Sequence, residues 1–106
     1  MEEIPLLKVP NQQVLVVLNG QYCTINVYQR KKRVYLDLAL NDEILRQGAI
    51  CLPGLDILGS PYPFEGFLFW TDELTEPDMQ QPPEYTQFGD RFHLYYITLD
   101  EASQYW

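Results

Sequence analysis

The chain has 106 residues, of which 46% are hydrophobic and 14% aromatic, and its formal net charge is −8. This length indicates one domain spanning residues 1–106, and the apolar content excludes a disordered chain. No apolar run reaches the ~20 residues of a membrane helix, and the acidic amino terminus lacks the basic region of a signal peptide, so we expect a soluble protein made in a cytoplasm and not bound to a membrane.

The negative charge is unevenly distributed along the chain. Residues 1–64 hold six acidic and six basic side chains, whereas residues 65–106 hold nine acidic side chains and one basic one, Arg91. Direct binding to nucleic acid requires clustered basic side chains that displace counterions. We therefore expect no nucleic-acid partner, and we interpret the acidic excess as a feature that serves a partner surface or solubility.

The first predicted element is a β-hairpin over residues 13–28, "QVLVVLNGQYCTINVY". Asn19-Gly20 tolerates the positive φ angles of a type I′ turn, and this two-residue loop places Leu18 opposite Gln21. One face of the hairpin should be buried, and it consists of Val14, Val16, Leu18, Cys23, Ile25 and Val27. The opposite face consists of Leu15, Val17, Tyr22, Thr24, Asn26 and Tyr28, and it is too apolar to meet only water. We expect another structure to cover part of it.

Further short strands follow in chain order. "RKKR" (30–33) is a turn, "VYLDLAL" (34–40) a third strand, and "ILRQGAICL" (44–52) one or two strands broken at Gly48. After a turn-rich stretch, "GFLFW" (66–70) and "RFHLYYITL" (91–99) complete the set, and residues 100–106 form a short tail. Because no window shows three turns of helical periodicity, the sequence predicts an all-β fold, a small antiparallel β-sandwich or barrel of six to eight short strands.

The residues that could perform chemistry are few and scattered. Cys23 and Cys51 do not supply the four ligands of a zinc site, and both lie in apolar stretches typical of buried residues. Nothing in the sequence brings His93, the single histidine, beside either cysteine as a general base. The carboxylates lack the spacing of a calcium loop. We therefore predict no catalytic residue, no metal, no cofactor and no enzymatic activity.

The segment 71–90, "TDELTEPDMQQPPEYTQFGD", carries six carboxylates, three prolines and no positive charge. Prolines stiffen a loop before binding, and aromatic rings anchor interfaces because they bury a large area at low entropic cost. We interpret the segment as a docking loop whose carboxylates face Lys or Arg of a partner. The predicted partner interface consists of Tyr62, Phe64, Trp70, Asp72, Glu73, Glu76, Asp78, Tyr85 and Phe88.

An ordered set of short motifs runs along most of the chain. It opens with "IPL", continues with "PNQQVLVVLNGQY", "YLDL" and "GAICLPGLDIL", and ends with "PPEYTQFGDRFHLYY". This set resembles the baseplate plug proteins of contractile-tailed bacteriophages, of the type found in cyanophage tails. The resemblance extends from residue 4 to about residue 96.

The resemblance implies a small, non-enzymatic all-β protein of the virion. Such a protein would plug or brace the junction between the tail tube and the central hub and spike, which are its implied partners. It would be assembled in the cytoplasm of the host bacterium, as several copies arranged around the three-fold or six-fold tail axis. The alternative is an acidic phage inhibitor whose carboxylates imitate the phosphates of nucleic acid and bind a host target.

Overall fold

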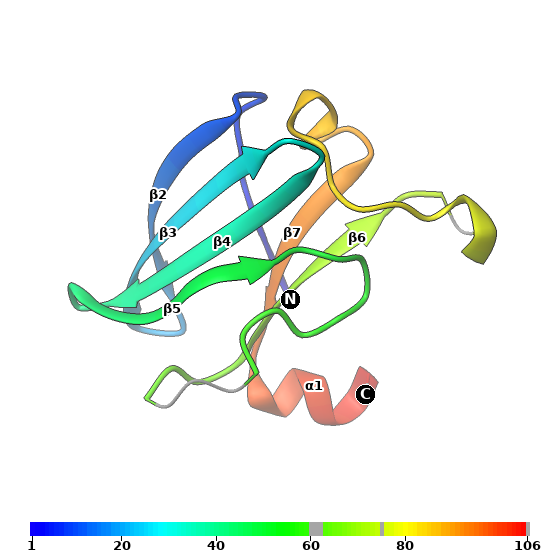
Figure 1. Cartoon of the computed structure of the whole chain (residues 1–106). Coiled ribbons are helices and arrows are strands. Elements are labelled where there is room, and N and C mark those ends of the chain that lie inside the picture. The colour runs from blue at the N-terminus through cyan, green and yellow to red at the C-terminus, as the bar shows by residue number, and fades with distance from the viewer. Residues whose placement is uncertain (60–62, 75, 106) are drawn as a thin grey trace.

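The computed structural model describes residues 1–59, 63–74 and 76–105 (Figure 1). The strands are β1 Glu2–Ile4, β2 Asn11–Leu18, β3 Gln21–Arg30, β4 Arg33–Leu40, β5 Glu43–Ile50, β6 Phe67–Asp72 and β7 Phe92–Ile97. Short 3-10 helices span Pro77–Met79 and Tyr85–Gln87, and the helix α1 spans Leu99–Tyr105.

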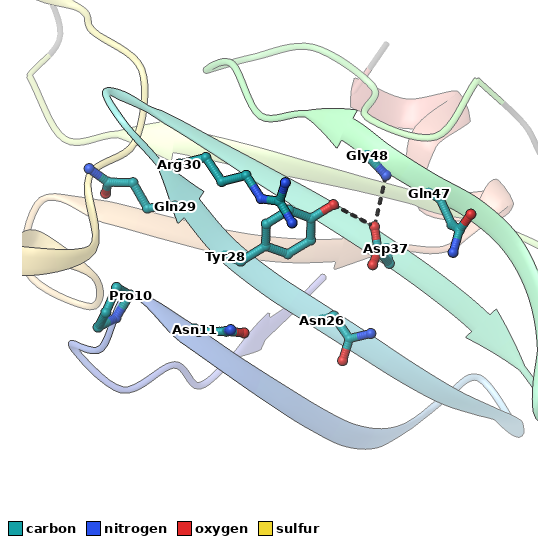
Figure 2. Close-up of a pocket in the computed structure, with 9 residues that line it drawn as sticks. All are labelled: Pro10, Asn11, Asn26, Tyr28, Gln29, Arg30, Asp37, Gln47 and Gly48. Carbon is teal, nitrogen blue, oxygen red and sulfur yellow. Dashed lines mark hydrogen bonds between the residues drawn. The ribbon is translucent and has the colours of Figure 1, made fainter.

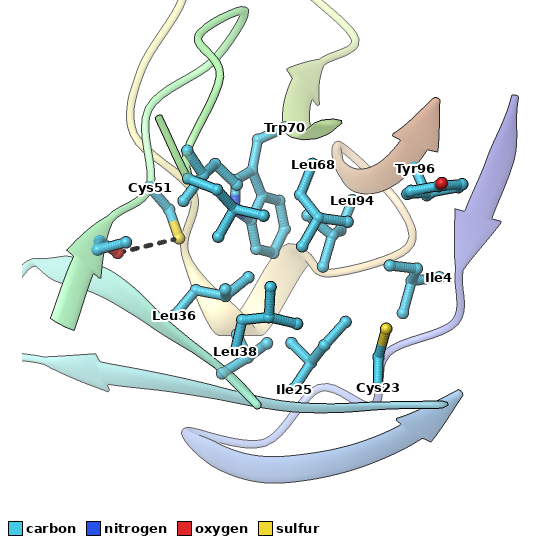
Figure 3. Close-up of a cluster of buried hydrophobic side chains, with 14 of the residues drawn as sticks. Ile4, Cys23, Ile25, Leu36, Leu38, Cys51, Leu68, Trp70, Leu94 and Tyr96 are labelled. Atoms are coloured by element: carbon cyan, nitrogen blue, oxygen red, sulfur yellow. Dashed lines mark hydrogen bonds between the residues drawn. The ribbon is translucent and has the colours of Figure 1, made fainter. Parts of the chain in front are cut away.

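The strands form two antiparallel sheets, one of four strands in the order β2-β3-β4-β5 and one of three in the order β1-β7-β6. The hydrophobic core lies between the sheets. Figure 3 shows side chains of the larger sheet, such as Ile25 and Leu38, pointing toward Leu68, Trp70 and Leu94 of the smaller one. The all-β prediction is confirmed, and the arrangement is a small sandwich.

The predicted β-hairpin is present as β2 and β3 with the predicted register. Leu18 lies opposite Gln21, and the turn residues Asn19 and Gly20 have φ angles of 51° and 76°. Leu18, Cys23, Ile25 and Val27 of the predicted dry face are buried, while Val14 and Val16 are partly buried and pack against the core. A two-residue turn fixes register, and register decides which face each side chain occupies.

The fourth strand of the larger sheet differs from the prediction. Residues 43–50 form one continuous strand, β5, rather than pieces broken at Gly48. The pairing of β4 with β5 instead shifts twice, between Leu36 and Leu38 and between Leu38 and Ala39, which marks a bulge. Gly48 has a φ of +64° and absorbs the irregularity without ending the strand.

The tail predicted after the last strand begins with the helix α1. Its start is a capping box: the Glu101 N–H donates to Thr98 Oγ1 at 3.2 Å, and the Thr98 N–H donates to Glu101 Oε1 at 3.1 Å. Ala102 packs the helix against Phe69 and Ile97. The sequence "TLDE" (98–101) carries this signal, but a helix of two turns is too short to show helical periodicity.

Candidate interaction surface

The outer face of the four-stranded sheet carries an exposed apolar patch. Strand register places Leu15, Thr24, Ala39 and Ile44 in one row across all four strands. The exposed fraction is 75% for Leu15, 67% for Tyr22, 61% for Ile44 and 52% for Val17. We call these four residues the apolar patch. Within the described residues the chain itself leaves these four side chains exposed, so the patch is free to meet another molecule, and the expectation that another structure covers part of this face stays a prediction.

The opposite end of the same face is polar and hollowed (Figure 2). Asp37 organises it: one carboxylate oxygen, Oδ1, accepts hydrogen bonds from the Tyr28 hydroxyl at 2.9 Å and from the Gly48 N–H at 2.7 Å. The Arg30 guanidinium lies 5.3 Å from the centre of the Tyr28 ring, and Tyr28 stacks on Tyr35. These contacts tie three strands together and present a fixed polar surface beside the apolar patch.

Within the acidic segment, Asp72 has a structural role. Its carboxylate is fully buried and pairs with the Arg91 guanidinium through bonds of 2.7 and 2.8 Å. It also accepts hydrogen bonds from the N–H groups of Leu74 and Gln81. Arg91 holds the pKa of Asp72 below its usual range. Residues 71–90 contain no cation, but the neighbouring Arg91 neutralises the charge of Asp72. Asp72 therefore shapes the loop, and its buried side chain does not face solvent, where a partner could reach it.

Three aromatic rings that we predicted as partner contacts lie in the core. Phe64 is 5% exposed, Phe88 1% and Trp70 0%, and the rings of Trp70 and Phe88 pack 5.2 Å apart. Their expected exposure is therefore wrong: they fill the sandwich because a small core needs large rings. Tyr85 is half-buried. Tyr62 lies outside the described residues.

The other carboxylates that we predicted at the interface reach the surface. Glu73, Glu76 and Asp78 are exposed, and they lie on the segment that extends away from the sandwich between β6 and the second 3-10 helix (Figure 1). We call these three residues the acidic edge. Their contact with a partner stays a prediction.

His93 joins the start of the acidic segment to the first strand. Its Nδ1 lies 2.7 Å from Glu3 Oε2 and its Nε2 lies 2.7 Å from Glu73 Oε1. A carboxylate only accepts hydrogen bonds, so these two contacts favour the imidazolium form of His93, in which both ring nitrogens carry protons. The hydrogen bond to Glu3 raises the pKa of His93. The two carboxylates lie on opposite sides of the ring, so the histidine acts as an ionic tie.

The two cysteines are free and buried. Cys23 Sγ lies against the Gln21 carbonyl and Cys51 Sγ against the Ala49 carbonyl. Burial raises the pKa of Cys23 to about 11 and that of Cys51 to about 12. A thiol with such a pKa holds its proton at neutral pH and is a poor nucleophile. Within the described residues, no helix is long and apolar enough to cross a membrane.

These features define a class: a small β-sandwich whose most distinctive surface is suited to contact with another protein. The chain belongs to the family described as cyanophage baseplate Pam3 plug gp18, which it matches over residues 1–100. This membership makes it a component of the phage tail baseplate that associates with other baseplate proteins, consistent with a structural role. No curated protein matches the chain.

The predicted interface omitted the exposed apolar residues on the outer face of the larger sheet. Leu15, Val17 and Tyr22 lie on the hairpin face that the sequence marked as unusually apolar, so the signal was present. What covers this face was left open. Ile44 was harder to find, because the bulge in β5 decides which of its side chains face outward.

Proposed function

We propose that this protein braces the junction between the tail tube and the central hub and spike of the baseplate, as one of several copies around the tail axis. The observation that carries the proposal is the apolar patch on a member of a baseplate plug family. Large exposed apolar side chains gathered on one face of a small protein mark a contact site, because leaving them in water is unfavourable.

The apolar patch supplies the affinity in this proposal. Leu15, Val17, Tyr22 and Ile44 project from three strands of a rigid sheet. Their conformational freedom is already reduced, so little further entropy is lost on docking. The surface that receives them is an apolar face of a neighbouring baseplate subunit.

The acidic edge supplies orientation. Glu73, Glu76 and Asp78 are exposed and belong to a chain of net charge −8. Charges of one sign at the rim of an interface steer a partner of the opposite sign and fix the register more than they add affinity. The complementary surface is therefore rich in Lys or Arg.

The test is complementation of a phage that lacks this protein. A variant carrying Tyr22→Ala and Ile44→Lys should fold, yet reduce infectious particles by more than tenfold and be missing from purified tails. A triple variant, Glu73→Gln with Glu76→Gln and Asp78→Asn, should give a smaller loss relative to the parent, and the loss should shrink as salt is raised, because salt also screens the steering charges of the parent.

The matched control is Glu65→Gln with Asp100→Asn, which removes two exposed carboxylates outside residues 71–90 and should leave the yield unchanged. If the patch variant enters tails at the parental level, the apolar patch is not the docking surface. If the control lowers the yield as much as the triple variant, the effect reports net charge and not the acidic edge.

A further inference from the structure

The four outermost strands of the two sheets differ in how their edges are protected. An open edge recruits other strands, and proteins protect edges with short length, charge, bulges or a covering segment. β1 has only three residues, two of them Glu. β6 is covered, because the Gly54 N–H donates to the Trp70 carbonyl at 2.8 Å and the Ile57 N–H to the Leu68 carbonyl at 3.1 Å. β5 is bulged and charged.

β2 has none of these protections. It is eight residues long, regular in its pairing with β3, and free of charge, proline and glycine. The two-residue turn makes Leu18 and Gln21 a hydrogen-bonded pair. Hydrogen-bonded pairs alternate along an antiparallel ladder, so the backbone groups of Leu18, Val16, Val14 and Gln12 bond to β3. The N–H and C=O groups of the residues between them, Gln13, Leu15 and Val17, point away from the sheet. Within the described chain these outward groups have no hydrogen-bond partner.

The charge pattern around β2 indicates what covers it. The protein has a net charge of −8, yet residues 11–29 contain no charged side chain. When a strand pairs with its own copy about a two-fold axis, a charge beside the axis lies near its own equivalent, and like charges across strands are destabilising. A strand that pairs with a different protein has no such restriction and commonly uses charge for orientation. An uncharged edge therefore fits pairing with itself.

We propose that two copies of the free protein associate through their β2 strands, antiparallel, to form one continuous eight-stranded sheet. With the two-fold axis at Val14, all the outward residues are paired: Asn11 lies opposite Val17 of the second copy, and Gln13 lies opposite its Leu15. Strand pairing alone buries less than the area of a standard stable interface, so the dimer is weak and concentration-dependent.

The pair is a state of the free chain and does not depend on the role proposed in the baseplate. The dimer shields the edge that would otherwise recruit unrelated strands.

Sedimentation equilibrium of the purified full chain tests the proposal, over concentrations on the order of 1 to 500 μM. The mass should rise from that of the 12.5 kDa chain toward twice that value. Gln13→Pro removes one outward N–H and spares the bonds to β3, and Gln13→Lys adds a charge that meets its own copy. Both variants should stay monomeric. If the proline variant does not fold, the lysine variant alone tests whether the dimer forms through β2.

Two control variants separate the edge from other surfaces. Gln47→Lys places the same charge on β5, at the opposite edge of the sheet, and Ile44→Lys places it in the apolar patch away from β2. Both should dimerise like the parent. A parent that is monomeric at every concentration, or folded Gln13 variants that dimerise as well as the parent, would overturn the proposal. So would a dimer lost only in Ile44→Lys, since the two copies would then meet through their faces.

Discussion

The β2–β3 hairpin without its last residue, Arg30 (residues 11–29), and the acidic segment (residues 71–90) are opposites in sequence. Each takes the place in the fold that the composition of the other would predict. The hairpin is uncharged and apolar, as a core element would be, yet half of its side chains lie on an exposed face. The acidic segment is polar and proline-containing, as a surface loop would be, yet Asp72, Phe88 and the adjoining Trp70 are buried.

The physical reason for the exchange lies in how each region meets its neighbours. A strand has two faces, and a two-layer sandwich can cover only one face of each sheet. A loop that closes the end of a sandwich must contribute rings to the core, and it can bury a carboxylate beside a matched guanidinium. Composition describes a segment, whereas burial depends on what the fold places against each side chain.

The largest effect should come from placing the same charge on the two faces of the hairpin. Ile25 is 0% exposed and Leu15 is 75% exposed. Ile25→Asp buries a carboxylate without a partner, which costs several kcal/mol against a total stability of ~5 to 15 kcal/mol, so the chain should not fold. Leu15→Asp should keep its stability in urea within about 0.5 kcal/mol of the parent. Similar urea midpoints for the two variants would show that the faces are not distinct.

Thiol labelling should separate the same two faces by rate. Cys23 faces inward and its pKa is raised to about 11 by burial. A cysteine introduced by Val17→Cys lies on the exposed face and keeps an ordinary pKa. At pH 8 the introduced thiol should react with a water-soluble disulfide reagent more than ~100-fold faster than the native cysteines, which react on unfolding. Rapid labelling of Cys23 in the native parent would place it outside the core.

In the acidic segment, two aspartates six residues apart should differ sharply. Asp72→Asn leaves the Arg91 guanidinium without its charge partner in a largely buried site and should lower the free energy of unfolding by about 3 kcal/mol. Asp78→Asn, at an exposed position, should change it by less than about 0.5 kcal/mol. Urea unfolding followed by tryptophan fluorescence measures both.

The pH dependence of Asp72 gives an independent check. Because its pKa is lowered in the folded protein, its contribution to stability is present above the unfolded value near 3.8 and is lost as the pH falls through the folded pKa. Asp72→Asn should therefore flatten the acid limb of the stability curve. An unchanged acid limb would mean that Asp72 contributes nothing to this dependence.

The smallest effect should come from the tie between His93, Glu3 and Glu73. The pKa of His93 is raised in the folded protein, so its contribution is fully present below the unfolded value of 6.5 and is lost as the pH rises through the folded pKa. The parent should lose some stability across that range, by less than the Asp72→Asn effect, and His93→Gln should abolish the loss. An equal loss in His93→Gln would assign it to another group.

Sequence alone determined the elements whose instructions are local. Asn19-Gly20 fixed the first turn, and the turn fixed the register of β2 and β3, since a two-residue loop admits only one pairing. Alternation in residues 34–40 placed Val34, Leu36, Leu38 and Leu40 inward, as observed. The family resemblance followed from ordered motifs along most of the chain, and the match over residues 1–100 confirmed it.

Only the tertiary structure decided which of the candidate site residues remain available to a partner. The pairing of Asp72 with Arg91 and the burial of Trp70, Phe64 and Phe88 depend on packing between segments that are distant in sequence or on opposite sheets. The open edge of β2 is likewise a property of strand order, because a strand becomes an edge only when nothing else pairs with it. Local patterns record what a side chain prefers, and long-range packing decides what it meets.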